Sequence, residues 1–459
     1  MLALMLRLPR GIARWHEDAW LYSVYPAQTL HKLQMGLLHE LPSTFTGLHP
    51  PAWPVLHALT ELWSPRPLWW LMQSILLSTG AVVLLARRSR LAALLLATSP
   101  VAVHYAAEVN QYALLTFALA GLWSTSVNGR GRVHGPMLAW GLLAGWTHVL
   151  GAVAAFLAVV SLPSRLRWNT LLVLVLGFSP LVPGVLTTIG DASTFTQPSF
   201  MAGLVATDLV GRFGVLGLAL PVFGLLGARR SPRLALGFVG GFVVLVCFVA
   251  ARVAAPHQFP YLLTLLPPLA LCVAAVPKAA WIFVPLALVQ AGWQLAFDGR
   301  RVQDLATDVS AESRAVDVAL GALAVPWTCP GTTLEPGCAG DALVLLRPPG
   351  RNDDDKTRTS AVLWRIRPWW SAPRIQLPEV PLGSNDHRHG QPRLVNLAGG
   401  PFAIYVHDQV RPTLSEVYGR HRAVWLVVSD VGPQSSMLES AVEMVGREAQ
   451  PVGADFLIR

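Results

Sequence analysis

Acidic residues are distributed very unevenly along this 459-residue chain. Residues 1–297 contain only seven of its 26 aspartates and glutamates, and residues 298–459 contain the other nineteen. A long stretch that is almost free of acids suits lipid, because an ionised carboxylate is costly inside a bilayer. Only 13% of all residues are charged, against ~25% in ordinary soluble proteins. We therefore predict an all-α polytopic membrane domain followed by a small water-soluble domain.

Apolar runs of roughly the length needed to cross a ~30 Å hydrocarbon core recur through the first part of the chain. They occupy residues 67–86, 91–107, 111–127, 169–190, 205–227, 234–251, 258–276 and 279–297. The stretch 136–162 is too long for one span and short for two, and Thr147 and His148 interrupt it. We interpret it as a hairpin of two short helices that turns near His148, which gives about ten or eleven spans within residues 67–297 and the segment before them.

Basic residues fall in short clusters between these runs, and the hairpin places every cluster on the same side of the membrane. The clusters are Arg87–Arg90, Arg130–Arg132, Arg165–Arg167, Arg229–Arg230 and Lys278. Positively charged loops face the cytoplasm, so the net charge of +9 reflects topology rather than a nucleic-acid partner. All seven acids of residues 1–297 then lie at the outer face, and membrane lipids surround the domain. We predict an integral protein of a bacterial inner membrane.

Two interpretations remain open for the N-terminal segment, residues 1–66, which holds the first outer loop and juxtamembrane helices. Residues 1–14 are apolar but too short to span, and three arginines interrupt them. They form either an amphipathic helix in the membrane interface or the remainder of a chain whose first spanning helix is missing. A short helix that ends near Trp63 is expected to lie along the outer surface.

Residues 298–459 have the pattern of a soluble α/β domain, which lies outside the cytoplasm by the parity of the spans. Strand-like runs occur at 342–346, 402–406, 423–428 and 454–458, separated by turns rich in proline and glycine. Cys329 and Cys338 flank a short loop, and a disulfide between them would be stable only in an oxidising compartment.

Five segments bring chemically useful side chains to the predicted outer face. Residues 15–20 contain Glu17 and Asp18, adjacent carboxylates that are costly beside a membrane unless they are hydrated, paired or functional. The other segments are 49–53 with His49, 104–114 with Glu108, 145–148 with His148, and 252–268 with Arg252, His257 and Tyr261. Carboxylates in such a set act as general bases, metal ligands or holders of a substrate hydroxyl.

The order and spacing of these segments resemble the GT-C class of membrane glycosyltransferases, in the group of dolichyl-phosphate-mannose protein mannosyltransferases and aminoarabinose transferases. Residues 15–20 are similar to the family's Asp-Glu-Ala-aromatic motif with its acids swapped, and residues 49–53 to its His-Pro-Pro segment. Residues 104–114 resemble Tyr-Ser-Gln-Glu-Ala-Arg-x-Tyr-Ala-Leu, with Glu108 at the glutamate. Thr147-His148 matches a Thr-His-aromatic segment, and residues 260–267 resemble Arg-Tyr-Leu-x-x-x-x-Pro.

The resemblance implies an inverting glycosyltransferase that moves a sugar from a polyprenyl-phosphate donor to an acceptor at the outer face. It implies Glu17 or Asp18 as the base, and Glu108 as a second acid that orients substrate or binds a metal. His49, His148, Arg252, His257 and Tyr261 are the implied substrate-binding residues. The leaving phosphate needs cations or a divalent metal ion to stabilise it. The sequence leaves the cofactor, the sugar and the acceptor open; protein, lipid and polysaccharide are all candidate acceptors.

The chain departs from the family pattern at two positions. Asn110 and Pro260 stand where the family has arginines, and both changes remove a cation that could contact a lipid phosphate. Arg252 or His257 are the candidates to replace those cations. The alternative function is a catalytically inactive GT-C-fold scaffold or a transporter. Transporters often show internal repeats and ionisable residues at the middle of the membrane, and the sequence pattern indicates neither.

Overall fold

The computed structural model describes two compact units of the chain. It describes residues 1–13, 50–63, 67–106, 110–125, 134–183, 213–250, 259–298, 318–319, 322, 341–346, 403–407, 423–428, 436–452 and 455–458. The helices up to Asp298 form the first unit, and the strands with one helix form the second, with the boundary between Val302 and Gln303. Each unit is described by itself below. The prediction of a helical part followed by a small sheet is confirmed.

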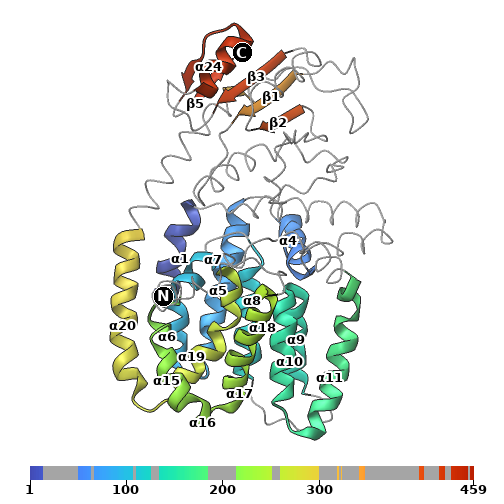
Figure 1. Ribbon diagram of the computed structural model, residues 1–459, viewed down its shortest axis with the longest axis vertical. Helices are drawn as coiled ribbons and strands as arrows, with labels where there is room; N and C mark the ends of the chain where they lie inside the picture. The colour runs from blue at the N-terminus through green and yellow to red at the C-terminus, as the bar shows by residue number, and fades with distance from the viewer. Residues whose placement is uncertain are drawn as a thin grey trace. The chain divides into compact units, whose positions relative to one another are not determined.

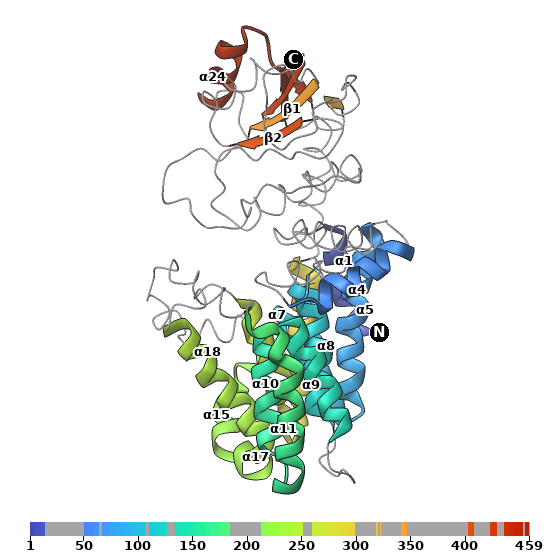
Figure 2. The ribbon, with the colours of Figure 1, turned by 90° about the vertical axis from the view of Figure 1, so that its right-hand side faces the viewer.

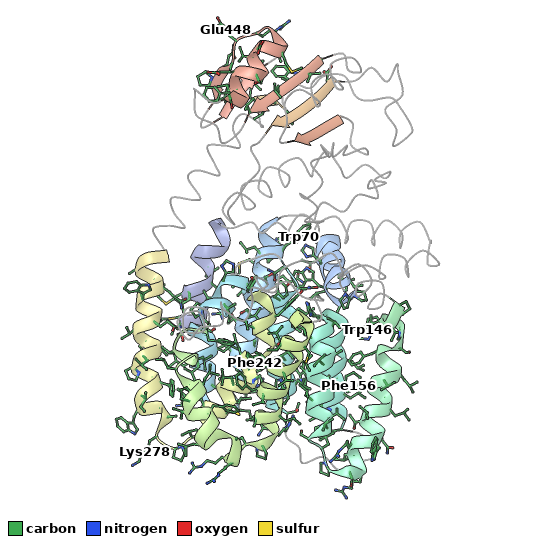
Figure 3. The ribbon with its side chains drawn as sticks, in the orientation of Figure 1. Trp70, Trp146, Phe156, Phe242, Lys278 and Glu448 are labelled. Atoms are coloured by element: carbon green, nitrogen blue, oxygen red, sulfur yellow. The ribbon has the colours of Figure 1, made fainter. Side chains whose placement is uncertain are left out.

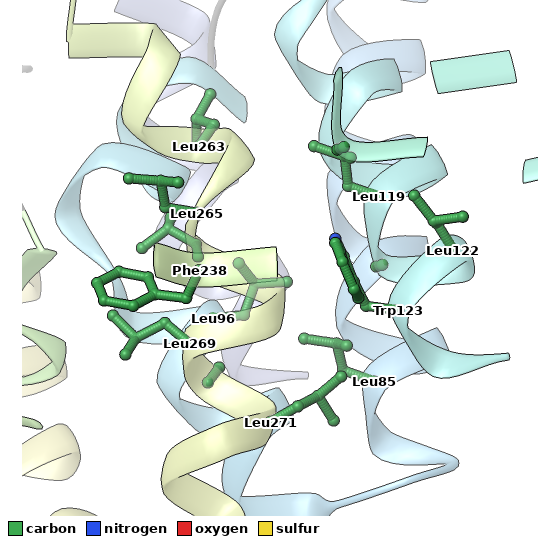
Figure 4. Packing of buried hydrophobic residues seen from close by; sticks show 14 of the residues in the cluster. Leu85, Leu96, Leu119, Leu122, Trp123, Phe238, Leu263, Leu265, Leu269 and Leu271 are labelled. Atoms are coloured by element: carbon green, nitrogen blue, oxygen red, sulfur yellow. The ribbon is translucent and has the colours of Figure 1, made fainter. Parts of the chain in front are cut away.

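Most helices of the first unit are apolar around their whole circumference, as buried or lipid-facing helices are. In chain order they are α1 (Leu2–Ala13), α4 (Ala52–Trp63), α5 (Pro67–Ala86), α6 (Arg90–Thr98), α7 (Pro100–Ala106), α8 (Tyr112–Ser124), α9 (Gly135–Thr147), α10 (Val149–Val160), α11 (Ser164–Phe178), η2 (Ser179–Leu181), η4 (Gly214–Leu216), α15 (Ala219–Val222), η5 (Phe223–Gly227), α16 (Ala228–Arg230), α17 (Pro232–Ala235), η6 (Leu236–Gly240), α18 (Gly241–Ala250), η7 (Phe259–Thr264), α19 (Leu266–Ala274), α20 (Ala279–Trp293) and η8 (Gln294–Asp298). Their buried faces share one core, in which Leu96 and Leu269 lie near Trp123 and Phe238 (Figure 4).

Successive helices run up and down the first unit, so the basic turns gather at one end (Figure 1). Figure 3 places Lys278 at this end and Trp70, in the first turn of α5, at the other. The predicted hairpin in 136–162 is confirmed: α9 and α10 are joined by His148 alone and pack side by side (Figures 1 and 2). The short helix predicted to end near Trp63 is α4, which packs on α5 and α9. Of the seven acids of residues 1–297, only Glu61 of α4 is among the described residues.

Two of the described helices are long and apolar enough to cross a membrane, Trp69–Ala86 and Ala279–Ala296. Several predicted runs are instead interrupted. The run 91–107 breaks at Ser99, because the ring of Pro100 cannot continue an α-helix from the preceding turn. The run 258–276 divides into η7 and α19.

Large apolar side chains cover much of the outside of the first unit, with tryptophans towards both ends. Trp168 and Trp281 are exposed near the basic turns, and Trp69 and Trp293 are exposed near the opposite end. Between Trp281 and Trp293, α20 rises about 18 Å. Exposed residues between the two levels include Leu76, Val83, Leu172, Leu176, Leu288 and Val289. Tryptophans at two depths that flank an apolar band are typical of membrane domains.

Helix α1 packs into the first unit instead of lying at its margin. Leu6 packs with Val103 of α7 and Ala291 of α20. Arg7 is fully buried: its Nε donates to Ser78 Oγ (3.0 Å), and its Nη1 donates to the carbonyl oxygen of Ala97 (3.1 Å). An amphipathic helix at the membrane interface would keep this guanidinium in water, so the interfacial interpretation is wrong for residues 2–13.

The second unit is a five-stranded sheet with the order β2-β1-β3-β5-β4. Its elements are β1 (Asp341–Leu346), β2 (Ala403–His407), β3 (Ala423–Val428), α24 (Ser436–Val445), β4 (Gln450–Val452) and β5 (Asp455–Ile458). The first three strands are parallel to one another, and β5 is antiparallel to β3 and to β4. All four predicted strands are present to within one residue. Cys329 and Cys338 lie outside the described residues.

The α9–α10 hairpin generates a stability prediction. A Cβ atom at Gly151 would lie 2.1 Å from the carbonyl oxygen of Ala144, whereas one at Gly292 of α20 would meet nothing within 4 Å. We expect Gly151→Ala to reduce the free energy of unfolding by about 1–3 kcal/mol, because backbone cannot move aside as a side chain can. Gly292→Ala is the matched control and should leave the unfolding midpoint in detergent unchanged or slightly higher. Equal midpoints for the two variants would contradict the close packing.

Candidate functional site

The described parts of three predicted site segments meet at the end of the first unit that lies opposite the basic turns. Aromatic rings connect them in sequence. The ring centroids of Tyr105 and Tyr112 are 5.2 Å apart, those of Tyr112 and His148 are 5.9 Å apart, and those of His148 and Tyr261 are 5.4 Å apart. His104 extends the row, 4.8 Å from Tyr105. Segments separated by more than 100 residues of chain thus share one cluster, which we call the His–Tyr cluster.

The backbone at His148 fixes how its imidazole is presented. This residue is the single extended link between α9 and α10, with φ −160° and ψ 143°. Its N–H donates to the carbonyl oxygen of Ala144 (3.0 Å), and its Nδ1 accepts from the N–H of Leu150 (3.1 Å). Because Nδ1 uses its lone pair to cap α10, the ring proton resides on Nε2. The ring of His148 is thereby fixed between those of Tyr112 and Tyr261.

Asn110 has a structural role at the position where the family has an arginine. Its side chain is fully buried, and its Oδ1 accepts from the N–H of Tyr112 (2.9 Å) at the start of α8. Asparagine suits this position because its short side chain can bond to the backbone two residues further on. The interaction orients the first turn of α8 and, with it, the ring of Tyr112.

Tyr261 is held by a 3₁₀ turn that is anchored by apolar side chains. The neighbouring Leu262 and Leu263 are buried in the core, and the hydroxyl of Thr264 donates to the carbonyl oxygen of Tyr261 (2.7 Å). The turn η7 packs against α7, α8 and α10, which are the elements that supply the rest of the cluster. Tyr261 itself is half-buried, so its ring closes one side of the cluster.

The predicted site residues divide between the described residues and the rest of the chain. The described residues include His148 and Tyr261, which are neighbours. The other predicted site residues lie outside the described residues; they are Glu17, Asp18, Glu108, His49, Arg252 and His257. Among the residues that the structure describes, no group of three or more histidines, cysteines or acids is placed to hold a metal ion. The described part of the site consists of aromatic rings, two of them histidine imidazoles.

A second histidine, which the sequence did not single out, is buried in α4. The ring of His57 lies 5.4 Å from that of Trp53 and 3.9 Å from that of Trp70 in α5, and all three side chains are fully buried. Trp53 and His57 are four residues apart, so they lie on one face of a helix. This spacing was the sequence feature from which their contact could have been predicted. This packing attaches α4, which follows the predicted His49 segment, to the start of α5.

Neither a scan against protein-family models nor searches of curated proteins and of solved structures finds a match for this chain.

The capping role of His148 can be separated from any role in binding. His148→Ala should reduce the free energy of unfolding by about 1 kcal/mol, because the N–H of Leu150 loses its acceptor. His148→Asn should lose less than half of that, since asparagine is among the best residues at this position. Thermal or denaturant unfolding of the purified protein measures both values, and equal losses would show that the ring contacts, and not the cap, dominate.

Proposed function

We propose that this protein is a GT-C-like membrane glycosyltransferase that uses a polyprenyl-phosphate-linked sugar as donor. The observation that carries the proposal is the convergence of His104, Tyr105, Tyr112, His148 and Tyr261 in one cluster at the end opposite the basic turns. The resemblance implies that these segments belong to one site. Convergence of separate segments at one end is expected of an active site and is not required of an apolar scaffold.

Membrane insertion is supported by the two long apolar helices and by the exposed tryptophans at two levels. The alternating helix directions support a topology of about ten or eleven spans. In this topology two spans are the long apolar helices, and the other spans are made of shorter helices. With the basic turns in the cytoplasm, the His–Tyr cluster faces outwards. In a bacterial inner membrane, the C-terminal sheet then belongs to the extracytoplasmic side.

The mechanism follows from what the transfer requires. Glu17 or Asp18 removes the proton of the acceptor hydroxyl or amine, which attacks the anomeric carbon from the face opposite the leaving group and inverts its configuration. Negative charge develops on the lipid phosphate as the bond to the sugar breaks, and Arg252 and His257 are the cations assigned to it. His148 and Tyr261 are the residues assigned to the sugar, which their rings would contact. Glu108 orients the acceptor or binds a metal ion.

The experiment that tests the proposal is sugar release and transfer in proteoliposomes supplied with a panel of radiolabelled polyprenyl-phosphate sugars. Loss of the base in Glu17→Gln or Asp18→Asn should lower turnover at least about 100-fold. Glu108→Gln should also lower it. Folded variants that retain full turnover with every active donor would contradict the assignment of these acids.

A matched pair of histidines tests the cluster in the same assay. His134 caps α9 through its Nδ1, which accepts from the N–H of Met137 (3.3 Å), just as His148 caps α10. It lies at the start of α9, the end with the basic turns. His148→Asn should therefore reduce turnover while His134→Asn does not. Equal effects would indicate that both histidines act only as helix caps.

The buried Arg7 favours a second candidate function, a transporter. An ionisable residue inside a membrane domain, beside a helix broken at Ser99, is characteristic of substrate paths. Around this break, Gln290 Nε2 and Gln294 Nε2 both donate to the carbonyl oxygen of Thr98. Movement of a fluorescent lipid phosphate between leaflets, lost in Arg7→Gln and unaccompanied by sugar release, would favour transport over transfer.

A further inference from the structure

Two arginines from different turns meet at the C-terminal end of α8. Arg88, in the turn after α5, donates from Nε to the carbonyl oxygen of Ser124 (2.5 Å). Arg233, in α17, donates from Nη1 to the carbonyl oxygen of Thr125 (2.9 Å) and from Nη2 to that of Leu122 (3.3 Å). Arg233 also lies over the ring of Trp123, with 5.8 Å between Cζ and the ring centroid. The end of α8 therefore joins two basic turns into one patch.

The positive charge of this patch greatly exceeds what the helix end can neutralise. The two turns contribute Arg87, Arg88, Arg90, Arg229, Arg230 and Arg233, and all of these except Arg233 are exposed. A helix C-terminus carries only about half a negative charge. The sequence contains no acidic residue in 62–107 or in 209–297, so neither turn brings a carboxylate of its own. The exposed arginines therefore carry positive charge that an anionic ligand can neutralise.

The depth of the patch indicates which anion is available. Trp281, in the first turn of α20, and Trp168, next to Arg167, are 81% and 67% exposed near the same end of the helices. Exposed tryptophans mark the level of lipid headgroups. At that level of a cytoplasmic leaflet the most concentrated anions are the phosphodiesters of acidic lipids, and an arginine fork fits a phosphate in two hydrogen bonds.

We propose that the end of α8, with Arg88 and Arg233 at its centre and Arg229 and Arg230 beside them, binds the phosphodiester headgroup of an acidic phospholipid. This site lies at the opposite end of the bundle from the His–Tyr cluster and does not depend on the proposed transfer reaction. The exposed arginines contact the headgroup, while Arg233 holds α17 against α8 and keeps the two turns together.

The full-length protein in zwitterionic detergent tests this site by titration with phosphatidylglycerol, followed by native mass spectrometry and by the unfolding temperature. Arg229→Gln/Arg230→Gln leaves the helix-capping contacts intact and should weaken lipid binding about tenfold, since both charges lie near the headgroup. Lipid should no longer raise the unfolding temperature of the Arg88→Gln/Arg233→Gln variant. This holds whether or not the substitutions change the unfolding temperature of the lipid-free protein. Arg165→Gln, an exposed arginine in the first turn of α11, is the matched control and should bind within about twofold of wild type.

Three results would overturn the proposal. Binding by every variant at the wild-type level would show that these arginines do not bind the headgroup. Equal binding of phosphatidylcholine would exclude recognition of an acidic headgroup. Protection by inorganic phosphate at the same concentrations as lipid would identify a soluble anion as the ligand.

Discussion

Backbone carbonyl groups at helix ends have no partner within their own helix, so inside an apolar bundle they need hydrogen-bond donors from elsewhere. This requirement explains where polar side chains of the first unit lie. An unpaired buried carbonyl costs roughly as much free energy as a lost hydrogen bond. Arg7 satisfies the carbonyl of Ala97, and two glutamines of α20 satisfy that of Thr98. At the other end, Arg88 and Arg233 satisfy carbonyls at the end of α8, and Arg167 satisfies that of Leu162, in the turn after α10. The arginines predicted to set topology therefore also terminate helices.

The same requirement shapes the His–Tyr cluster. Asn110 and His148 each satisfy a backbone N–H at the start of a helix, and each in doing so orients an aromatic ring. The short side chain of Asn110 thus provides local order at the start of α8. A site of this kind is rigid before any ligand arrives, which reduces the entropy lost on binding.

Local patterns predicted the fold well and the site only in part. The strands and the hairpin at His148 followed from alternation, turn residues and loop charge, all of which act over a few residues. Pro100 indicated the break at Ser99, but the apolar run continues through it and favoured a single unbroken span. The burial of Arg7 was not readable from the sequence, because two of its acceptors, the hydroxyl of Ser78 and the carbonyl of Ala97, lie 71 and 90 residues away along the chain. For the candidate site, the meeting of His148 with Tyr261 agrees with the resemblance, while the positions of the acids lie outside the described residues.

A link of one residue between α9 and α10 has a mechanical consequence. His148 is a single extended residue, and its N–H and its side chain are both hydrogen-bonded. It therefore resists a change in the angle between α9 and α10, so the two helices move together as one rigid body about the His148 ring. The far end of α10 is tied through the carbonyl of Leu162 to Arg167. A displacement of the imidazole by a fraction of an ångström would therefore reappear at the turn between α10 and α11, where a probe far from the His–Tyr cluster can detect it.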